Sequence, residues 1–204
     1  MIFKICGITS AEDAAAAIEA GANALGFNFW PRSPRYVAPE RAAGIVCGGG
    51  VRRVGVFVNE SPEEMEEIAR IARLDVAQLH GEERPDEFPA GVPVWKAARV
   101  TAAFNFAPYE NSTAEALVLD GPAGDLYGGS GQSFDWTLAA AVRKRVILAG
   151  GLDASNVARA IAAALPWGVD ACSRIESAPG KKDHRKMHEF LKAAQQAAKE
   201  ALRA

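Results

Sequence analysis

The sequence is poor in cysteine and has no apolar run long enough to cross a lipid bilayer. Its three cysteines, Cys6, Cys47 and Cys172, are odd in number and widely spaced, without a Cys-X-X-Cys motif or a Cys/His cluster. This pattern argues against a disulfide framework and against a zinc site, and it fits a reducing compartment. We therefore expect no metal centre and no membrane partner.

A block of charge of one sign is missing as well. The chain has 23 basic and 25 acidic residues, for a formal net charge of -2, and contains no basic tract. Because phosphate contacts require clustered Lys and Arg, we expect no nucleic-acid partner. The amino-terminal MIFKICGIT has neither the basic region nor the long apolar stretch of a secretory signal, which predicts an unprocessed, cytoplasmic protein.

What the chain does have is a regular alternation of two kinds of segment. Eight short runs rich in β-branched residues are expected to be strands, at residues 1–6, 23–29, 53–58, 75–79, 92–97, 116–120, 145–149 and 168–172. Stretches rich in Ala, Glu and Arg predict helices at about 11–20, 39–46, 61–73, 134–144, 153–164 and 183–203, with weaker candidates near 82–88 and 101–106. Three helix starts carry capping signals, namely Ser10, Ser61 followed by Pro62 and Glu64, and Asp153 or Ser155.

This alternation predicts the fold class. Strands joined through helices require right-handed crossovers and therefore run parallel, and eight of them can close into a (β/α)8 TIM barrel of the α/β class. A doubly wound open sheet is the alternative, although it normally has fewer strands. No low-complexity linker interrupts the pattern, so we expect residues 1–204 to form a single barrel domain.

The parity of the strands predicts which side chains enter the barrel, because alternate residues face opposite sides. The parity that carries the polar residues near the carboxyl ends of the strands is expected to face inward. It comprises Lys4, Cys6, Gln78, Lys96, Asp120, Asp170 and Cys172, whereas Leu79, Trp95, Leu119 and Val169 lie on the opposite, apolar parity. Buried charges must be paired, so the barrel interior should hold charges of both signs.

Two of these inward residues could perform acid-base chemistry. Cys6 is more often a small core residue in such a context, but at the carboxyl end of a strand its sulfur would face the active-site mouth. Lys4 is our candidate for the cation that favours its thiolate. Asp120 would act as an acid if a lid-like loop at 121–131 removed it from water, or it caps a turn or pairs with Lys96.

Turns after the last two strands are candidates for binding an anion. Gly150 and Gly151 follow the seventh strand, and Ser173 and Arg174 follow the eighth, where barrels commonly bind phosphate through backbone N–H groups. The Arg174 side chain could add a charged contact or remain a solvated loop cation.

The proline-restricted segment PRSPRYV provides a second candidate site for an anion. Pro31 and Pro34 could hold Arg32 and Arg35 toward a carboxylate, although both could equally be surface arginines. His184 and His188 have no acidic or cysteine partner in the sequence pattern that would make them a metal site.

With these residues placed, the sequence closely resembles the phosphoribosylanthranilate isomerase family of tryptophan biosynthesis. The resemblance rests on KICGIT, ALGFNFWPRSPRYV, VGVFVN, QLHGEE, WKA, LD followed by YGGSGQSFDW, LAGGL, and VDACS with ESAPGKKD. One departure is the turn after the eighth strand, which reads SSGVE in many family members and Cys172-Ser173-Arg174-Ile175-Glu176 here. If that turn requires a positive φ, Arg174 is strained.

The resemblance implies an Amadori rearrangement of N-(5-phosphoribosyl)anthranilate to 1-(2-carboxyphenylamino)-1-deoxyribulose 5-phosphate, without any cofactor. It implies that Cys6 is the general base, that Asp120 is the general acid and that Arg35 meets the anthranilate carboxylate. The substrate-binding candidates are Arg35, Gly150, Gly151, Asp170, Ser173 and Arg174. The family contains both monomers and homodimers, and either state is compatible with this sequence.

Two other readings stay open at this point. The related isomerase of histidine biosynthesis would be expected to carry an Asp at the end of the first strand, where Cys6 stands. A phosphate-ligand binder without turnover is the other reading, and only Arg174 supports it.

Overall fold

The computed structural model describes residues 1–101, 105–121 and 134–203, and these segments contain a closed barrel of eight parallel strands. The strands are β1 Ile2–Cys6, β2 Ala24–Asn28, β3 Arg52–Phe57, β4 Val76–Leu79, β5 Val94–Arg99, β6 Ala116–Asp120, β7 Arg145–Leu148 and β8 Gly168–Ala171. Each strand pairs with the next one along the chain, and β8 closes the barrel against β1. The predicted (β/α)8 fold is confirmed, with every strand within two residues of its expected limits.

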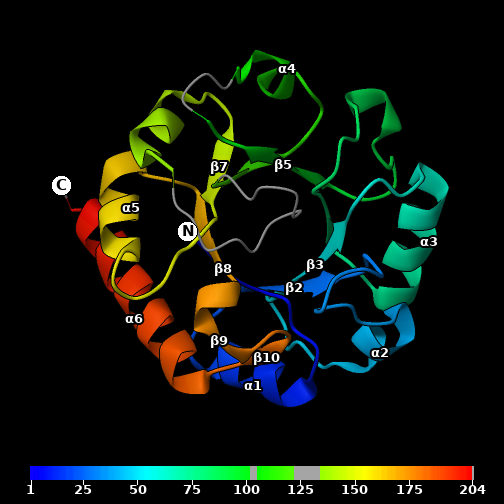
Figure 1. Ribbon diagram of the computed structural model, residues 1–204, viewed down its shortest axis with the longest axis horizontal. Coiled ribbons are helices and arrows are strands. Elements are labelled where there is room, and N and C mark those ends of the chain that lie inside the picture. Colours follow the sequence, from blue (N-terminus) through cyan, green and yellow to red (C-terminus); the bar gives the residue numbers. More distant parts are fainter. Residues whose placement is uncertain (102–104, 122–133, 204) are drawn as a thin grey trace.

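Helices surround the barrel (Figure 1). They are α1 Ala11–Glu19, α2 Pro39–Gly44, α3 Pro62–Ala72, α4 Ala107–Glu110, α5 Val157–Ala164 and α6 His184–Ala201. Three short 3-10 helices, η1 Pro85–Glu87, η2 Trp136–Ala141 and η3 Ser173–Ile175, and a hairpin of β9 Glu176–Ala178 and β10 Lys181–Lys182 complete the described structure. The long α6 packs against α5 on one side and against α1 on the other. The last helix of the chain therefore lies beside the first.

Helix starts agree with the capping signals at two of three positions. The Ser10 side chain accepts a hydrogen bond from the backbone N–H of Asp13, and Ser61 forms a capping box with Glu64. Helix α5 instead begins after Asn156, because the Asp153 carboxylate is engaged by the Ser155 backbone N–H at 2.8 Å. Neither Asp153 nor Ser155 is therefore the cap of α5.

Three expected helices differ from the structure. The stretch expected at 134–144 is the 3-10 helix η2, and the candidate at 82–88 is reduced to the single turn η1. The candidate at 101–106 includes residues 102–104, which lie outside the described residues, and α4 begins only at Ala107. A short 3-10 turn and a short α-helix have similar sequence signals, so propensity alone does not separate them.

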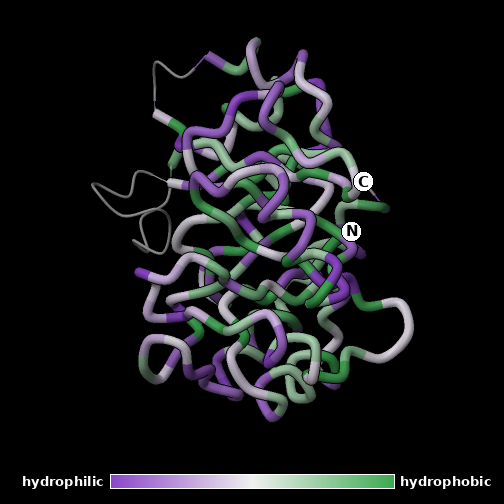
Figure 2. The backbone as a smooth tube through the Cα atoms, turned by 90° about the vertical axis from the view of Figure 1, so that its right-hand side faces the viewer, coloured by the Kyte–Doolittle hydropathy of each residue, from purple (hydrophilic) through white to green (hydrophobic). Residues whose placement is uncertain are grey.

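The core has two layers, as a closed barrel requires. One layer fills the barrel, and the other lies between the strands and the surrounding helices. The inner layer comprises Ile2, Ala24, Val54, Val76, Trp95, Ala97, Ala116, Val118, Ile147 and Ala149. In the side view of Figure 2, apolar green segments cross the middle of the molecule, where the strands lie. In the described part of the chain, no helix is both long and apolar enough to cross a membrane.

Strand β5 corrects the predicted inward face. In the register of β4 and β5, Gln78 is opposite Trp95 and Leu79 is opposite Lys96, so Trp95 faces the barrel interior and Lys96 faces outward. The Lys96 ammonium donates hydrogen bonds to the Gly81 carbonyl at 2.6 Å and to the Glu83 carboxylate at 2.8 Å. Its partner is therefore a glutamate in the β4–η1 connection, and the considered pairing of Lys96 with Asp120 is wrong.

Candidate active site

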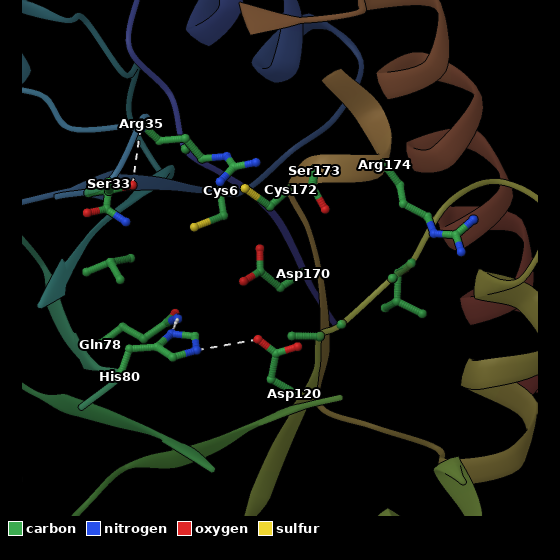
Figure 3. A pocket seen from close by; sticks show the side chains of 17 residues that line it. Cys6, Ser33, Arg35, Gln78, His80, Asp120, Asp170, Cys172, Ser173 and Arg174 are labelled. Carbon is green, nitrogen blue, oxygen red and sulfur yellow. Dashed lines mark hydrogen bonds and ion pairs between the residues drawn. The ribbon is translucent and has the colours of Figure 1, made fainter. Parts of the chain in front are cut away.

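A pocket opens at the carboxyl ends of the strands (Figure 3). The cavity is partly open, and its empty space of about 660 Å³ includes solvent at the mouth. Its lining includes every catalytic and substrate-binding candidate from the sequence, namely Cys6, Arg35, Asp120, Gly150, Gly151, Asp170, Ser173 and Arg174, together with Asn28, Gln78, His80 and Cys172. Residues separated by most of the chain therefore meet around one cavity.

A buried ion pair lies below the pocket floor. The Lys4 ammonium is fully buried and lies 2.7 Å from the Asp170 carboxylate, because β1 and β8 place the two residues opposite each other in register. Burial raises the pKa of Asp170 to about 7, even though Lys4 opposes the shift. Burial alone would lower the pKa of Lys4, but Asp170 and Cys6 raise it, so the ammonium remains charged.

The Cys6 thiol has a pKa well below its ordinary value. The largest cause is a hydrogen bond with the Cys172 side chain, and the positive charges of Lys4 and Lys182 add to it against the opposing effect of burial. Gly26 lies opposite Cys6 in β2, where a Cβ would come within 2.8 Å of the Cys6 sulfur. The glycine thus leaves the space that the sulfur occupies, and the predicted thiolate at the end of β1 has the surroundings that it needs.

Asp120 ends β6 and enters the pocket from another side than Cys6, with Asp170 between them in Figure 3. Its side chain is buried, and one carboxylate oxygen, Oδ2, lies 3.4 Å from His80 Nε2. The other oxygen, Oδ1, has no hydrogen-bond partner within residues 1–101, 105–121 and 134–203. The lid-like loop expected at 121–131 lies, from residue 122 onward, outside the described residues.

Arg35 is held at the pocket wall by Glu176. The guanidinium donates from Nε at 2.9 Å and from Nη2 at 2.8 Å to the two carboxylate oxygens, in a bidentate arrangement. Glu176 is also 2.7 Å from the Lys182 ammonium. Burial raises the pKa of Glu176, but Arg35 and Lys182 outweigh it and lower the pKa. A fixed guanidinium that lines the cavity can meet a ligand carboxylate without a large loss of side-chain entropy.

The turns after β7 and β8 both line the pocket. Gly150 and Gly151 have φ values of 76° and 62°, so the turn uses the left-handed region that favours glycine. Arg174 lies in η3 and is absent from the described non-glycine residues with positive φ, which removes the expected strain. Its side chain is half-exposed, points away from the cavity and lies 3.0 Å from the Asp153 carboxylate.

Sequence reasoning missed several residues that shape this pocket. Glu176 pairs with Arg35, Lys182 pairs with Glu176 and approaches Cys172, and His80 contacts Asp120. These residues lie in the ESAPGKKD and QLHGEE stretches, which support the family resemblance. Neither stretch has a spacing that by itself predicts a contact with the pocket. In the described part of the chain, no three His, Cys, Asp or Glu side chains gather closely enough to hold a metal ion.

Fold and pocket together define the chain as a (β/α)8-barrel enzyme with a thiol and a carboxyl at the carboxyl ends of its strands. Residues 3–193 match the family described as N-(5'phosphoribosyl)anthranilate (PRA) isomerase. The chain belongs to this family, and it is an isomerase of tryptophan biosynthesis.

Individual relatives cover nearly the whole chain. The N-(5'-phosphoribosyl)anthranilate isomerase of Solibacter usitatus is 68% identical over 197 residues, which span 97% of this chain and 98% of that protein. The solved structure of the Thermus thermophilus phosphoribosyl anthranilate isomerase is 38% identical with a TM-score of 0.87, covering 96% of this chain and 99% of that one. A phosphoribosyl anthranilate isomerase in complex with reduced 1-(o-carboxyphenylamino)-1-deoxyribulose 5-phosphate is 37% identical with a TM-score of 0.83, covering 96% and 100%.

Proposed function

We propose that the chain converts N-(5'-phosphoribosyl)anthranilate to 1-(2-carboxyphenylamino)-1-deoxyribulose 5-phosphate by general acid-base catalysis, with Cys6 as the base and Asp120 as the acid. The observation that carries the proposal is a thiol with a lowered pKa and a buried carboxyl that line one pocket from different sides. A direct assay of turnover with N-(5'-phosphoribosyl)anthranilate tests it. Binding without turnover would leave only a phosphate-ligand binder.

The two groups would act in sequence on one small molecule. As the acid, the Asp120 carboxyl would donate a proton to the ribose ring oxygen, which opens the ring and leaves a protonated Schiff base at C1. The Cys6 thiolate then removes the proton from C2, and the electrons of that bond flow into the iminium to give an enolamine. The enolamine tautomerises to the aminoketose. Because the iminium is itself the electron sink, the reaction needs no cofactor.

The ends of the substrate would be held by groups on either side of the acid and base. Gly150, Gly151 and the start of η3 at Ser173 and Arg174 offer a turn that can approach a phosphate through its backbone N–H groups. Arg35 would bind the anthranilate carboxylate, and Asp170 lines the same cavity. Fixing both anionic ends places the reacting carbons between Cys6 and Asp120. The bound reduced product named for a 37% identical relative supports this class of ligand.

Arg35→Ala is expected to weaken substrate binding more than it slows the chemistry. The variant removes the guanidinium that faces the pocket, while Glu176 retains Lys182 as a partner at 2.7 Å. Steady-state kinetics should show KM raised well above about 2-fold with a smaller change in kcat. Arg32→Ala, in the same loop, is the matched control and should keep a normal KM. A rise of KM no larger than about 2-fold for Arg35→Ala would rule out the carboxylate contact.

Lys4→Met is expected to move the acidic limb of the pH profile of kcat/KM to higher pH. The pKa of Cys6 is lowered in part by the positive charge of Lys4, so the pKa rises when this charge is removed. A base with a higher pKa becomes protonated, and inactive, at a higher pH. The profile should be recorded for both proteins at the same ionic strength. An unchanged profile would discard Lys4 as a partner of the thiolate.

The same variant needs a stability control, because it leaves Asp170 buried without its ammonium partner. The pKa of Asp170 is already raised to about 7, and Lys4 is a cause that opposes this rise. A carboxyl with a raised pKa binds more protons in the folded state, so the free energy of unfolding falls as pH rises through that pKa. Urea unfolding above pH 7 should therefore show Lys4→Met as less stable than the Lys4→Met/Asp170→Asn double variant.

The two thiols in the pocket bear on the compartment, and a relative bears on the assembly. A thiolate base beside a second thiol works only under reducing conditions, which supports the cytoplasm as the location.

We place the chain as a monomer or a homodimer, since the Thermotoga maritima relative is described as a dimeric enzyme from which monomers were generated. Sedimentation equilibrium distinguishes the two states.

A further inference from the structure

We propose that Cys6 and Cys172 form a reversible disulfide site inside the active-site pocket. The backbone brings the two residues together, because β1 and β8 pair in parallel with Lys4 opposite Asp170 and Ile5 opposite Ala171. One further step along both chains places Cys6 beside Cys172. Neighbouring strands lie about 4.8 Å apart, which is within the Cα separation of about 4.4–6.8 Å that a disulfide spans.

The side chains approach each other as the register requires. Both sulfurs line the same pocket, and they lie next to each other in Figure 3. The Cys172 sulfur packs against the residue that follows Cys6, since a Cβ on Gly7 would lie 3.2 Å from it. The hydrogen bond between the two thiols lowers the pKa of Cys6 and raises that of Cys172, which favours the thiolate on Cys6 and the thiol on Cys172.

This division suits a two-step oxidation by a peroxide. The Cys6 thiolate attacks one peroxide oxygen, the O–O bond breaks, and the released hydroxide takes a proton to leave as water. The product is a Cys6 sulfenic acid. The Cys172 sulfur then loses its proton and attacks the Cys6 sulfur, which forms the S–S bond and expels the sulfenic oxygen as a second water. Two thiols are oxidised and one peroxide is reduced, so the step balances.

Access and surroundings favour the reaction at this pair. Cys6 and Cys172 are both partly exposed in an open pocket, so a molecule as small as hydrogen peroxide can reach them. The Lys182 ammonium lies 4.0 Å from the Cys172 sulfur and would stabilise its thiolate during the second step. Cys47, the third cysteine, is buried outside the pocket, and the burial raises its pKa. It is therefore the natural control.

The consequence for activity rests on the proposed function, whereas the disulfide does not. A Cys6 sulfur bonded to Cys172 can no longer accept a proton, so oxidation should stop the isomerisation until a reductant cleaves the bond. In Cys172→Ser no resolving thiol is present, and the sulfenic acid of Cys6 would proceed to the sulfinic acid, which dithiothreitol does not reverse.

The test treats the wild-type enzyme, Cys172→Ser and Cys47→Ser with hydrogen peroxide and compares each protein with its own untreated activity. Non-reducing peptide mass mapping should show a Cys6–Cys172 cross-link in wild type and in Cys47→Ser. Once the cross-link is fully formed, both should lose at least about 100-fold in activity, as expected for loss of a catalytic base, and regain it with dithiothreitol. Cys172→Ser should lose activity without a cross-link and without recovery.

The outcomes separate the two claims. Inactivation of wild type without a cross-link, or equal recovery of Cys172→Ser with dithiothreitol, would overturn the disulfide site. A fully formed cross-link with retained activity would leave the disulfide site standing and would refute Cys6 as the base.

Discussion

Replacing Cys6 with alanine should lower kcat by at least about 100-fold, the scale of a lost general base. Alanine keeps the backbone at the end of β1 and removes only the sulfur that would accept the C2 proton. Water in the pocket is a poor substitute, because it lacks both the fixed position of the sulfur and the nearby Lys4 charge that favours the thiolate. Steady-state and single-turnover assays with N-(5'-phosphoribosyl)anthranilate measure the loss.

Circular dichroism and urea unfolding should show that Cys6→Ala remains folded, since a small side chain next to a cavity contributes little to the core. Cys47→Ala is the matched control, because it removes a thiol that lies outside the pocket. Its kcat should stay close to that of wild type. A near-normal rate for Cys6→Ala would remove Cys6 from the mechanism.

Asp120→Asn should lower turnover by a similar factor of at least about 100, because the amide has the shape of the carboxyl but no acidic proton to donate. The buried position of Asp120 and its 3.4 Å contact with His80 should survive the change, which keeps the loss specific to the chemistry. Asp86→Asn, an exposed aspartate on η1 that pairs with Arg84, is the control and should leave the rate unchanged. Turnover of Asp120→Asn within a few-fold of wild type would assign the acid to another group.

The fold could be predicted because its signals are local and repeated. Each strand is a short apolar run between turns, and eight such runs separated by helices leave few topologies for the chain. The position of Cys6 and Asp120 at one pocket could be predicted for the same reason, since both end a strand and the carboxyl ends of barrel strands converge on one face. Neither the fold nor these two positions depends on the details of side-chain packing.

Contacts between residues far apart in the chain could not be predicted from the sequence. Parity within β5 depends on how the strand is placed against β4, and one residue of shift exchanged Trp95 and Lys96 between the two faces. The bidentate pairing of Arg35 with Glu176 joins residues 141 positions apart, and no periodic pattern connects them. The direction of Arg174 was equally open, because its partner Asp153 lies in a different loop.

The central claim is that a thiol and a carboxyl act on one substrate from different sides of one pocket. A crystal structure of this chain with reduced 1-(o-carboxyphenylamino)-1-deoxyribulose 5-phosphate tests it most directly. We predict the Cys6 sulfur in contact with C2, the Asp120 carboxyl within about 2.6–3.2 Å of the oxygen on C4, and the carboxylate of the ligand at Arg35. A ligand seated so that Cys6 and Asp120 touch neither of these atoms would contradict the account.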